Sequence, residues 1–430
     1  MYMEEDFHKK AGQREGLLLI ITAAFVLCNA TALSLALDGR IAWSHLWAPL
    51  VWTTAVALAY LLLTRFRPDH DPFYLPLFAL LSGWGLILVD RLAANFLHRQ
   101  VLWVVIGTAA MLIVAILPRN LRMLRHYRYT WLLAGLFLLA STLLFGVNPS
   151  GFGAALWLPI PLPFINMKVF LQPSELLKLL LVVFLASYFA DREAALRRGQ
   201  SRAGLRGALP YLAPLLLMWG FCMVLLIWQR DLGAATLYFL VFLALLYLAT
   251  SDPRYVWFGL LLLLAAAAIA YFWFDVVALR IDAWWNPWPE SLDRAFQIVQ
   301  SLYAVAAGGV SGQGAGQGFP TYIPVVHSDF VFAAVAEEWG LIGSLGLVAV
   351  FMILTYRGFH SAMKSFRPFK TYLAVGITLL FAIQALMIMG GVTKILPLTG
   401  VTLPFISYGG SSLLISSIML GLLLYLSSES

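Results

Sequence analysis

The sequence alternates between long apolar runs and short polar segments. A helix needs about 20 mostly apolar residues to cross the hydrocarbon core of a bilayer. Twelve runs approach or exceed that length, although the twelfth is short and the tenth contains Glu337 and Glu338. The pattern predicts an all-α polytopic membrane protein with about twelve transmembrane helices. The predicted spans are Gly16–Leu37, Leu46–Thr64, Phe73–Val89, Val101–Leu117, Tyr129–Gly146, Ser174–Ala190, Pro210–Trp228, Gly233–Thr250, Val256–Phe274, Phe330–Tyr356, Tyr372–Gly390 and Ser412–Leu426.

The composition excludes a soluble globular protein. Hydrophobic residues make up 61% of the chain and charged residues 11%, whereas a soluble domain has about 25% charged residues. Cys28 and Cys222 both lie inside apolar runs and give neither a disulfide framework nor a metal-ligand spacing. The polar start Met1–Glu15 is followed by a run long enough to span, so we predict no cleavable signal peptide.

Basic residues gather in three of the segments that separate the apolar runs. Short loops rich in Lys and Arg normally stay in the cytoplasm, and twelve spans place all three segments on one side with the N-terminal tail. Both termini are therefore predicted to be cytoplasmic, and the net charge of +7 reports topology rather than nucleic-acid binding. The basic residues are Lys9, Lys10 and Arg14; Arg119, Arg122, Arg125 and Arg128; Arg192, Arg197, Arg198, Arg202 and Arg206; and Arg357, Lys364, Arg367 and Lys370.

Two segments on the opposite side are longer than a simple connection requires. Val147–Pro173 is one, and Asp275–Asp329 is the other; loops of such length are usually functional or disordered. The second contains tryptophans and a stretch from Leu292 to Ala307 with helical periodicity, which predicts an amphipathic helix at the outer membrane interface. The tryptophans are Trp284, Trp285 and Trp288; the periodic apolar positions are Phe296, Val299, Tyr303 and Ala307; the polar positions are Arg294, Gln297, Gln300 and Ser301.

Polar residues at the membrane edge are the best indicators of function in such a chain. Pro173 and Ser174 predict a helix start, and Glu175 lies three residues before Lys178, so the two share a face and can pair. The pair has two interpretations: a structural ion pair, or part of a wet cavity within the bundle. The segment Gln229–Gly233 is a tight outer turn, for which a plain polar hairpin is the alternative to a site.

Two further polar clusters follow. Glycines between Gly308 and Gly318 have no Lys-Ser/Thr after them and face away from the cytoplasm, so a nucleotide-binding loop is rejected. Asp329 lies where this outer segment enters a span, and helix N-capping is the alternative to a functional role. The segment Thr393–Ser412 is rich in Pro and Gly and predicts an irregular or re-entrant segment, tolerated only if it is buried in protein or lines water.

As an ordered set, these clusters resemble the SEDS family, whose members include RodA, FtsW and SpoVE. The resemblance covers roughly residues 75–426. Within the family, the sequence of the segment Gly390–Pro397 favours RodA. The matching pieces are Gln172-Pro173-Ser174-Glu175 with Lys178; Gln229, Asp231, Leu232 and Gly233; Gln297, Gln300 and Ser301; Gly308 and Gly309; Pro324, His327, Asp329 and Phe330; Leu396, Pro397, Thr399 and Gly400; and Pro404, Phe405, Ser407, Tyr408, Gly409 and Gly410.

The chain departs from the family pattern at several positions. Gly153 and Trp157 of the first outer loop are present, but Leu156 occupies the place of an arginine, Arg230 that of a proline and Val325 that of a glutamate. The family usually has ten spans. We therefore expect an N-terminal addition, residues 1–68 with two spans, before a ten-span core at residues 69–430.

The resemblance implies polymerisation of lipid II, the undecaprenyl-pyrophosphate-linked precursor of peptidoglycan, at the outer face of the bacterial inner membrane. The chemistry needs a base and positive charge near the departing pyrophosphate. Asp329 is the implied catalytic carboxylate. The outer cations are Arg91, Arg99, Lys168, Arg230, Arg280, Arg294 and Lys394, with Lys178 added if its span opens to a cavity. The implied substrate-binding residues are Trp157, Glu175, Lys178, Arg230, Gln297, Gln300, His327, Lys394, Thr399 and Ser407.

The resemblance also implies partners and leaves alternatives open. A class B penicillin-binding protein would supply the transpeptidase, and membrane lipids surround the chain. No protein metal site is predicted, and a divalent cation, Mg²⁺ or Mn²⁺, is left open as a cofactor. A lipid II flippase and an inactive scaffold are the alternatives from other classes, and the residues do not choose between elongation and division.

Overall fold

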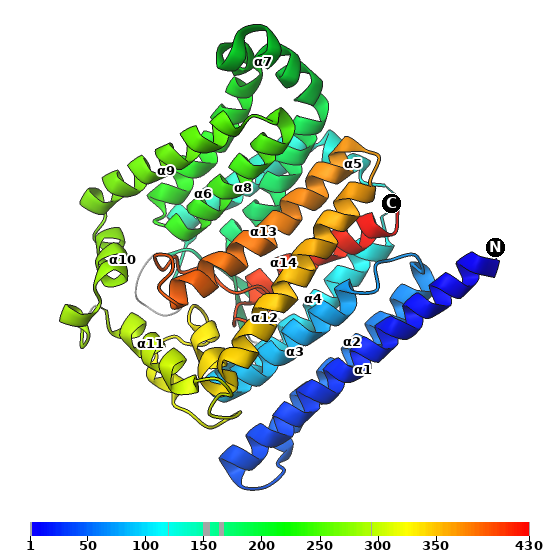
Figure 1. Cartoon of the computed structure of the whole chain (residues 1–430), viewed down its shortest axis with the longest axis vertical. Coiled ribbons are helices and arrows are strands. Elements are labelled where there is room, and N and C mark those ends of the chain that lie inside the picture. Colours follow the sequence, from blue (N-terminus) through cyan, green and yellow to red (C-terminus); the bar gives the residue numbers. More distant parts are fainter. Residues whose placement is uncertain (1, 119, 149–154, 163–166, 294, 430) are drawn as a thin grey trace. The chain divides into compact units, whose positions relative to one another are not determined.

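The computed structural model describes residues 2–118, 120–148, 155–162, 167–293 and 295–429, with side chains described outside 2–11, 160–162, 167–169 and 199–209. The chain forms two compact units, each built from separate stretches of sequence (Figure 1). Unit 1 contains residues 1–117, 266–357 and 384–429, and unit 2 contains residues 118–265 and 358–383. The fold is almost entirely helical, which confirms the predicted all-α class.

Helices make up most of the elements of both units (Figure 1). The helices are α1 (Tyr2–Asp38), α2 (Trp43–Phe66), α3 (Tyr74–Ala93), α4 (Leu97–Ile116), α5 (Arg122–His126), α6 (Arg128–Phe145), α7 (Pro173–Trp228), α8 (Leu232–Thr250), α9 (Pro253–Trp273), α10 (Asp275–Trp285), α11 (Phe296–Gly308), α12 (Val331–Lys364), α13 (Pro368–Val392) and α14 (Gly410–Ser427), with short 3₁₀ turns η1 (Ala94–Phe96), η2 (Trp288–Glu290) and η3 (Pro320–Tyr322).

The described helices confirm the predicted spans. Among the described residues, eleven helical stretches are long and apolar enough to cross a membrane. One of them, Tyr74–Ile116, contains both α3 and α4, which the turn η1 separates. Counted singly, these two helices bring the number of spans to the predicted twelve.

The long helix α7 corresponds to two predicted spans. The Tyr188 hydroxyl donates a hydrogen bond to the Tyr211 carbonyl oxygen, although 23 residues of straight helix would separate them by about 34 Å. The chain therefore reverses direction between these residues, and the two ends of α7 form separate spans, Pro173–Arg198 and Pro210–Trp228.

In unit 1, α1 and α2 run side by side and pack against α3 and α4 (Figure 1). Gly83 on α3 permits the close approach, because a Cβ there would lie 2.8 Å from the Trp52 ring of α2. Polar side chains add to the contact: the Trp52 indole donates to the Ser82 hydroxyl at 3.1 Å, and His45 hydrogen bonds to Asp90 at 2.7 Å. The two N-terminal helices are thus an integral part of this unit.

Helices α4 and α14 form a close helix pair in unit 1. A Cβ at Gly107 would lie 2.7 Å from atoms of Leu413 and Ser417, and a Cβ at Gly421 would lie 2.5 Å from the Met111 carbonyl oxygen. Small residues allow this backbone approach, as they commonly do between membrane helices.

The outer segments differ in part from expectation. Residues 147–173 contain an antiparallel hairpin of β1 (Leu158–Leu162) and β2 (Met167–Leu171), which the sequence did not predict. The predicted irregular segment is confirmed, because α13 ends at Val392 and α14 begins only at Gly410.

The predicted amphipathic helix corresponds to α11, which is shorter than the predicted stretch and whose predicted apolar positions do not all face the protein. Ser301, assigned to the polar side, is fully buried, whereas Tyr303 is 54% exposed and Ala307 is exposed. In a membrane protein an apolar side chain gains as much by facing lipid as by facing protein, so apolar periodicity does not identify the protein-facing side.

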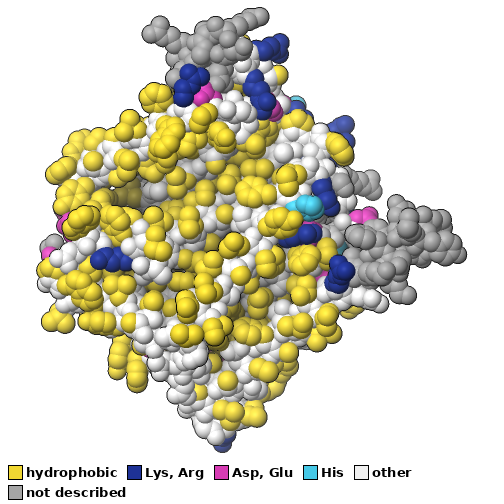
Figure 2. Space-filling view, in the orientation of Figure 1, with side chains coloured by type: hydrophobic (Ala, Val, Ile, Leu, Met, Phe, Trp, Pro, Cys, Tyr) yellow, Lys and Arg dark blue, Asp and Glu magenta, His cyan; other side chains and the backbone are white. Residues whose placement is uncertain are grey.

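Hydrophobic side chains cover most of the face shown in Figure 2, and Lys and Arg side chains lie mainly near its edges. Helix α9 illustrates the pattern: only 6% of its most apolar window is buried. Such a surface is suited to lipid rather than water, and the chain is a multi-pass membrane protein.

Candidate functional site

Asp329 lies two residues before α12, at the end of the long outer segment of unit 1. Its Oδ1 accepts a hydrogen bond from the Ser328 hydroxyl at 2.9 Å. No backbone N–H of the described first turn of α12 donates to the carboxylate, so helix capping does not account for this residue. Its Oδ2 receives no hydrogen bond from a described residue and is available to a ligand.

The irregular segment between α13 and α14 holds the loop that carries Asp329. The Tyr408 N–H donates to the His327 carbonyl oxygen at 2.8 Å, and the Ser407 hydroxyl donates to the Ser328 carbonyl oxygen at 2.6 Å. Ser407, which is 3% exposed, also accepts from the Leu403 N–H at 2.9 Å. Its hydroxyl is thus occupied by the backbone, and Ser407 positions the loop.

Arg280 reaches the same place from α10. Its Nη1 donates to the Thr399 carbonyl oxygen at 3.2 Å. A Cβ at Gly400 would lie 3.1 Å from Arg280 Nη2 and 3.6 Å from Asp329 Oδ2, so the guanidinium and the carboxylate face each other across this glycine. Gly400 has φ +72°, a conformation that favours glycine. The Thr399 hydroxyl is buried and has no hydrogen-bond partner among the described residues.

The electrostatic environment suits a proton acceptor. Burial raises the pKa of Asp329 above the usual carboxyl range, and this effect outweighs the Ser328 hydrogen bond and the Arg280 charge, which both lower it. Burial lowers the pKa of His327, which favours the neutral imidazole. The His327 ring lies beside Tyr408 and Phe96, with centroid distances of 5.7 and 5.4 Å.

The glycine-rich segment before Asp329 is attached to α12 by the two glutamates within that span. The carboxylate of Glu338 accepts from the Gly316 N–H at 3.1 Å and from Arg91 Nε at 3.0 Å, and the carboxylate of Glu337 accepts from the Phe319 N–H at 2.7 Å. Arg91 also donates to the Gly318 carbonyl oxygen at 3.0 Å. These contacts give the glutamates and Arg91 a structural role.

Glu175 and Lys178 belong to unit 2, near the start of α7. Lys178 Nζ lies 2.5 Å from Glu175 Oε2 and its side chain is 2% exposed, which confirms that the two residues pair. The Tyr238 hydroxyl of α8 donates to the Ser174 carbonyl oxygen beside them. That the pair lines a cavity stays a prediction.

The remaining predicted residues of unit 2 lie outside the helices. Trp157 pairs with Val147 in an isolated β-bridge, with N···O distances of 3.2 and 2.8 Å. Arg230 is exposed and has φ 61°, in the left-handed region. Asp231 caps α8 by accepting from the Ala234 N–H at 3.2 Å, as expected for a hairpin. Gly153 lies outside the described residues.

The structure therefore gathers part of the predicted site. Within unit 1 it joins Asp329, His327, Thr399 and Ser407 with the added Arg280. Lys394, in the same irregular segment, donates to the Trp285 carbonyl oxygen of α10 at 3.3 Å.

Two of the predicted unit 1 residues stand apart from this group. Gln297 and Gln300 lie partly exposed on α11, and neither makes a hydrogen bond with the Asp329 group in the described structure.

Arg280 is among the outer cations predicted from the sequence but not among the predicted substrate-binding residues. Its position just after the α9 span is the signal in the sequence that indicates a role at the membrane edge.

Comparison with known proteins identifies relatives over most of the chain. A family model described as "Cell cycle protein" (FtsW, RodA, SpoVE) matches residues 74–430. A curated relative named peptidoglycan glycosyltransferase RodA from Mycobacterium tuberculosis is 35% identical over 425 residues, which is 95% of this chain and 89% of the relative. A probable peptidoglycan glycosyltransferase FtsW from Geobacter sulfurreducens is 37% identical over 336 residues, covering 78% of this chain and 86% of the relative.

Solved structures give the same result for the fold. A chain from a structure titled "Structural coordination of polymerization and crosslinking by a peptidoglycan synthase complex" matches with a TM-score of 0.69 and 26% identity over 84% of this chain and 98% of that one. The rod shape determining protein RodA of Thermus thermophilus matches with a TM-score of 0.59 and 26% identity over 83% of this chain and 96% of that one.

Proposed function

The chain belongs to the FtsW/RodA/SpoVE family of cell cycle proteins, and from this membership we infer that it is a peptidoglycan glycosyltransferase. Curated relatives that align with nearly the whole chain have that name. The single observation that supports an enzyme most directly is the Asp329 carboxylate, which is partly buried, has an open oxygen and faces a guanidinium. The agreement with RodA over 95% of the chain favours the RodA type.

The proposed substrate is lipid II. In the reaction the 4-hydroxyl of an acceptor sugar attacks the anomeric carbon of a donor sugar, and the bond from that carbon to the pyrophosphate oxygen breaks. Asp329 accepts the hydroxyl proton through Oδ2 as the new glycosidic bond forms. A carboxylate with a raised pKa is a stronger base than an ordinary one, which favours this proton transfer.

The departing pyrophosphate requires positive charge. The charge of Arg280 acts on Asp329, and its hydrogen bond to the Thr399 carbonyl oxygen fixes its direction. Lys394 lies on the same irregular segment. We assign Arg280 to the positioning and charge balance of the Asp329 centre, and Lys394 to the pyrophosphate. The unpartnered Thr399 hydroxyl is a candidate donor to a sugar or phosphate oxygen.

A divalent cation is part of this proposal. Mg²⁺ usually keeps several waters and binds substrate phosphates, so the lipid pyrophosphate would supply its donors, and Asp329 Oδ2 stays available to accept the proton. When bound, Mg²⁺ or Mn²⁺ would neutralise charge on the pyrophosphate. Removal of divalent cations with a chelator is expected to lower the rate of polymerisation, and re-addition is expected to restore it.

We further propose that the site faces the outside of the cell and that both termini are cytoplasmic, since the basic segments would otherwise be exported. A class B penicillin-binding protein is the proposed partner. The similar structure titled as a peptidoglycan synthase complex supports this, because its title couples polymerization with crosslinking.

Polymerisation of purified lipid II by the purified full-length chain, with and without its partner, tests the function. Wild-type protein is expected to form glycan chains, and Asp329→Asn is expected to lose at least about 100-fold in rate, the order expected for loss of a general base. Asp293→Asn, an exposed carboxylate of the same outer segment, is the matched control and should retain activity.

The same assay separates the enzyme from the flippase alternative. Detergent micelles have no two sides, so glycan formation there requires catalysis and not transport. Protein-dependent translocation of lipid II in sealed liposomes, without glycan product under any partner condition, would replace our assignment. A folded Asp329→Asn variant with the wild-type rate would remove Asp329 from the chemistry.

A further inference from the structure

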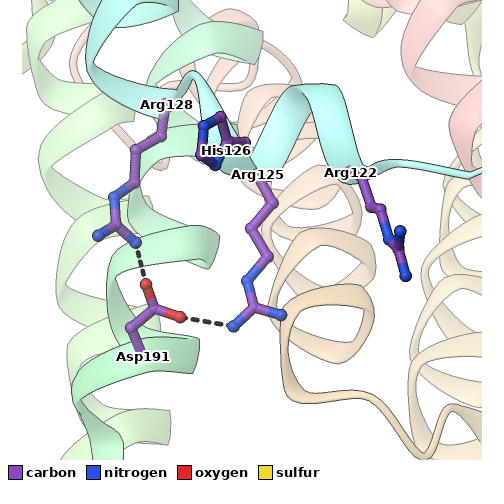
Figure 3. Close-up of a pocket in the computed structure, with 5 residues that line it drawn as sticks. All are labelled: Arg122, Arg125, His126, Arg128 and Asp191. Atoms are coloured by element: carbon purple, nitrogen blue, oxygen red, sulfur yellow. Dashed lines mark hydrogen bonds and ion pairs between the residues drawn. The ribbon is translucent and has the colours of Figure 1, made fainter.

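A cationic pocket lies in unit 2, separate from the residues assigned to catalysis (Figure 3). It has a volume of about 380 Å³ and is lined by Arg122, Arg125, His126, Arg128 and Asp191. The first three come from α5, Arg128 begins α6, and Asp191 lies on α7. Three guanidinium groups thus share the pocket with one carboxylate, and positive charge is in excess.

Asp191 holds the side chains of two of the three arginines in place, and the guanidinium of the third does not pair with it. Arg125 lies 2.6 Å from Asp191 Oδ1, and Arg128 pairs with Asp191 Oδ2 (Figure 3). Arg128 also donates to the Ser187 carbonyl oxygen at 3.0 Å, and the Ser187 hydroxyl donates to the Arg125 carbonyl oxygen at 3.1 Å. Arg122 extends apart from Asp191, and its guanidinium has no hydrogen bond or ion pair with a described residue.

The pocket lies where spans end. Arg128 is the first residue of the span Arg128–Phe145, and Asp191 lies near the end of the span Pro173–Arg198. Apolar side chains continue from it along the lipid-facing side of α6 at helical spacing: Tyr129 is 43%, Leu133 56% and Phe137 74% exposed. A cationic pocket that continues into an apolar stripe matches the two halves of a phospholipid.

We propose that this pocket binds the phosphate of an anionic phospholipid headgroup, with the acyl chains along α6. Guanidinium groups recognise phosphate oxygens through paired hydrogen bonds, and basic pockets between membrane helices are suited to anionic headgroups. Arg122 supplies the open charge, while Arg125 and Arg128 are held in place by Asp191. On the topology predicted by the basic segments, the lipid belongs to the cytoplasmic leaflet.

The test uses the full-length chain in nanodiscs of phosphatidylcholine, with and without phosphatidylglycerol. The readouts are the Tm of the protein and the lipid that remains bound to it in native mass spectrometry. Phosphatidylglycerol is expected to raise the wild-type Tm and to remain bound. Arg122→Gln is expected to weaken binding about five-fold, the effect of one basic residue near a charged surface. Arg122→Lys should restore part of it. The Arg122 guanidinium makes no hydrogen bond or ion pair with a described residue, so its replacement leaves the Asp191 contacts intact.

Arg192→Gln is the matched control, because Arg192 is exposed on α7 next to Asp191 but does not line the pocket. An equal loss of phosphatidylglycerol binding in both variants would show that only the general surface charge matters, and it would overturn the proposal. Equal binding of phosphatidylcholine and phosphatidylglycerol would also overturn it. Stabilisation by inorganic phosphate to the same extent, without retained lipid, would identify a site for a soluble anion instead of a headgroup.

Discussion

Asp329 and Arg280 together determine how the proposed reaction depends on pH. A general base acts when deprotonated, so activity is present above the pKa of Asp329 and is lost as the pH falls through it. Burial raises that pKa, so the loss begins at a higher pH than for an ordinary carboxyl group. The Arg280 charge lowers the pKa, and Arg280→Gln is therefore expected to move the acid limb of the rate profile to higher pH.

The measurement is the pH dependence of glycan formation by wild-type protein and by Arg280→Gln. Arg192→Gln removes the same charge elsewhere and should leave the acid limb in place. An acid limb that stays fixed in Arg280→Gln would show that this guanidinium does not act on the base.

Val325 has φ 56°, a conformation that is strained for a β-branched residue. Its side chain is 55% exposed, so little burial is lost on replacement. Asn adopts this region more readily, and Val325→Asn is expected to stabilise the protein by about 1 kcal/mol. Chemical unfolding in detergent measures the change. Val326→Asn is the control: this neighbour is 3% exposed, and its replacement should destabilise.

The sequence predicted the residues at the centre of the proposed site, but not all of their contacts. The His-Ser-Asp-Phe context identified Asp329, and the Thr393–Ser412 cluster predicted the segment that packs against it. Ser407 was assigned to substrate, yet both of its hydrogen bonds go to backbone groups. Arg280 lies 49 positions before Asp329, and only the tertiary fold joins them, so no local spacing could select it.

At the scale of elements, the glycine-rich segment depends on α12 for its conformation. Gly312, Gly314 and Gly316 all have positive φ, with values of 83°, 103° and 77°. Glu338 bonds to this segment and to Arg91, and its side chain is 1% exposed. Glu338→Gln removes the carboxylate that pairs directly with Arg91 and is expected to cost about 3–5 kcal/mol.

Hydrogen exchange of residues 312–319 measures this effect locally. Protection is expected to fall there in Glu338→Gln and to remain unchanged in unit 2. Glu290→Gln, at an exposed position on η2, is the control. Unchanged exchange in the Glu338 variant would mean that the backbone contacts of the segment suffice.

Hydropathy predicted the spans because length and apolarity alone determine whether a helix can cross a bilayer. It did not predict which face of α11 packs on protein, since lipid and protein interiors are equally apolar. The β1–β2 hairpin was also missed. Its first strand, Leu-Pro-Ile-Pro-Leu, contains two prolines, which normally argue against a strand.

At the scale of the whole molecule, the two N-terminal helices remain the proposed addition to a ten-span core. The family model begins at residue 74, whereas the mycobacterial RodA aligns with 95% of the chain. Deletion of Met1–Thr64 removes His45 from the buried Asp90 and Glu15 from His70. We expect a lower Tm but retained polymerisation, because none of the assigned site residues lies in the deleted part.

Thermal unfolding and lipid II polymerisation of the truncated chain check this prediction. Full-length His45→Gln isolates one of the lost contacts and should lower Tm by a smaller amount. A folded truncation with no glycan product, even with its partner, would contradict dispensability. The division into two units of discontinuous sequence was not predicted, because apolar runs contain no information on which helices pair.

The pairing of α4 with α14 has a consequence for biosynthesis. Helix α4 ends at Ile116, and its partner begins only at Gly410, so roughly 300 residues must be translated in between, which takes about 15–60 s at ordinary rates. Throughout that interval α4 lies in the bilayer without the helix that packs against Gly107 in the folded protein. A ribosome that stops before the last helix therefore leaves a nascent protein in which α4 is inserted without its partner helix.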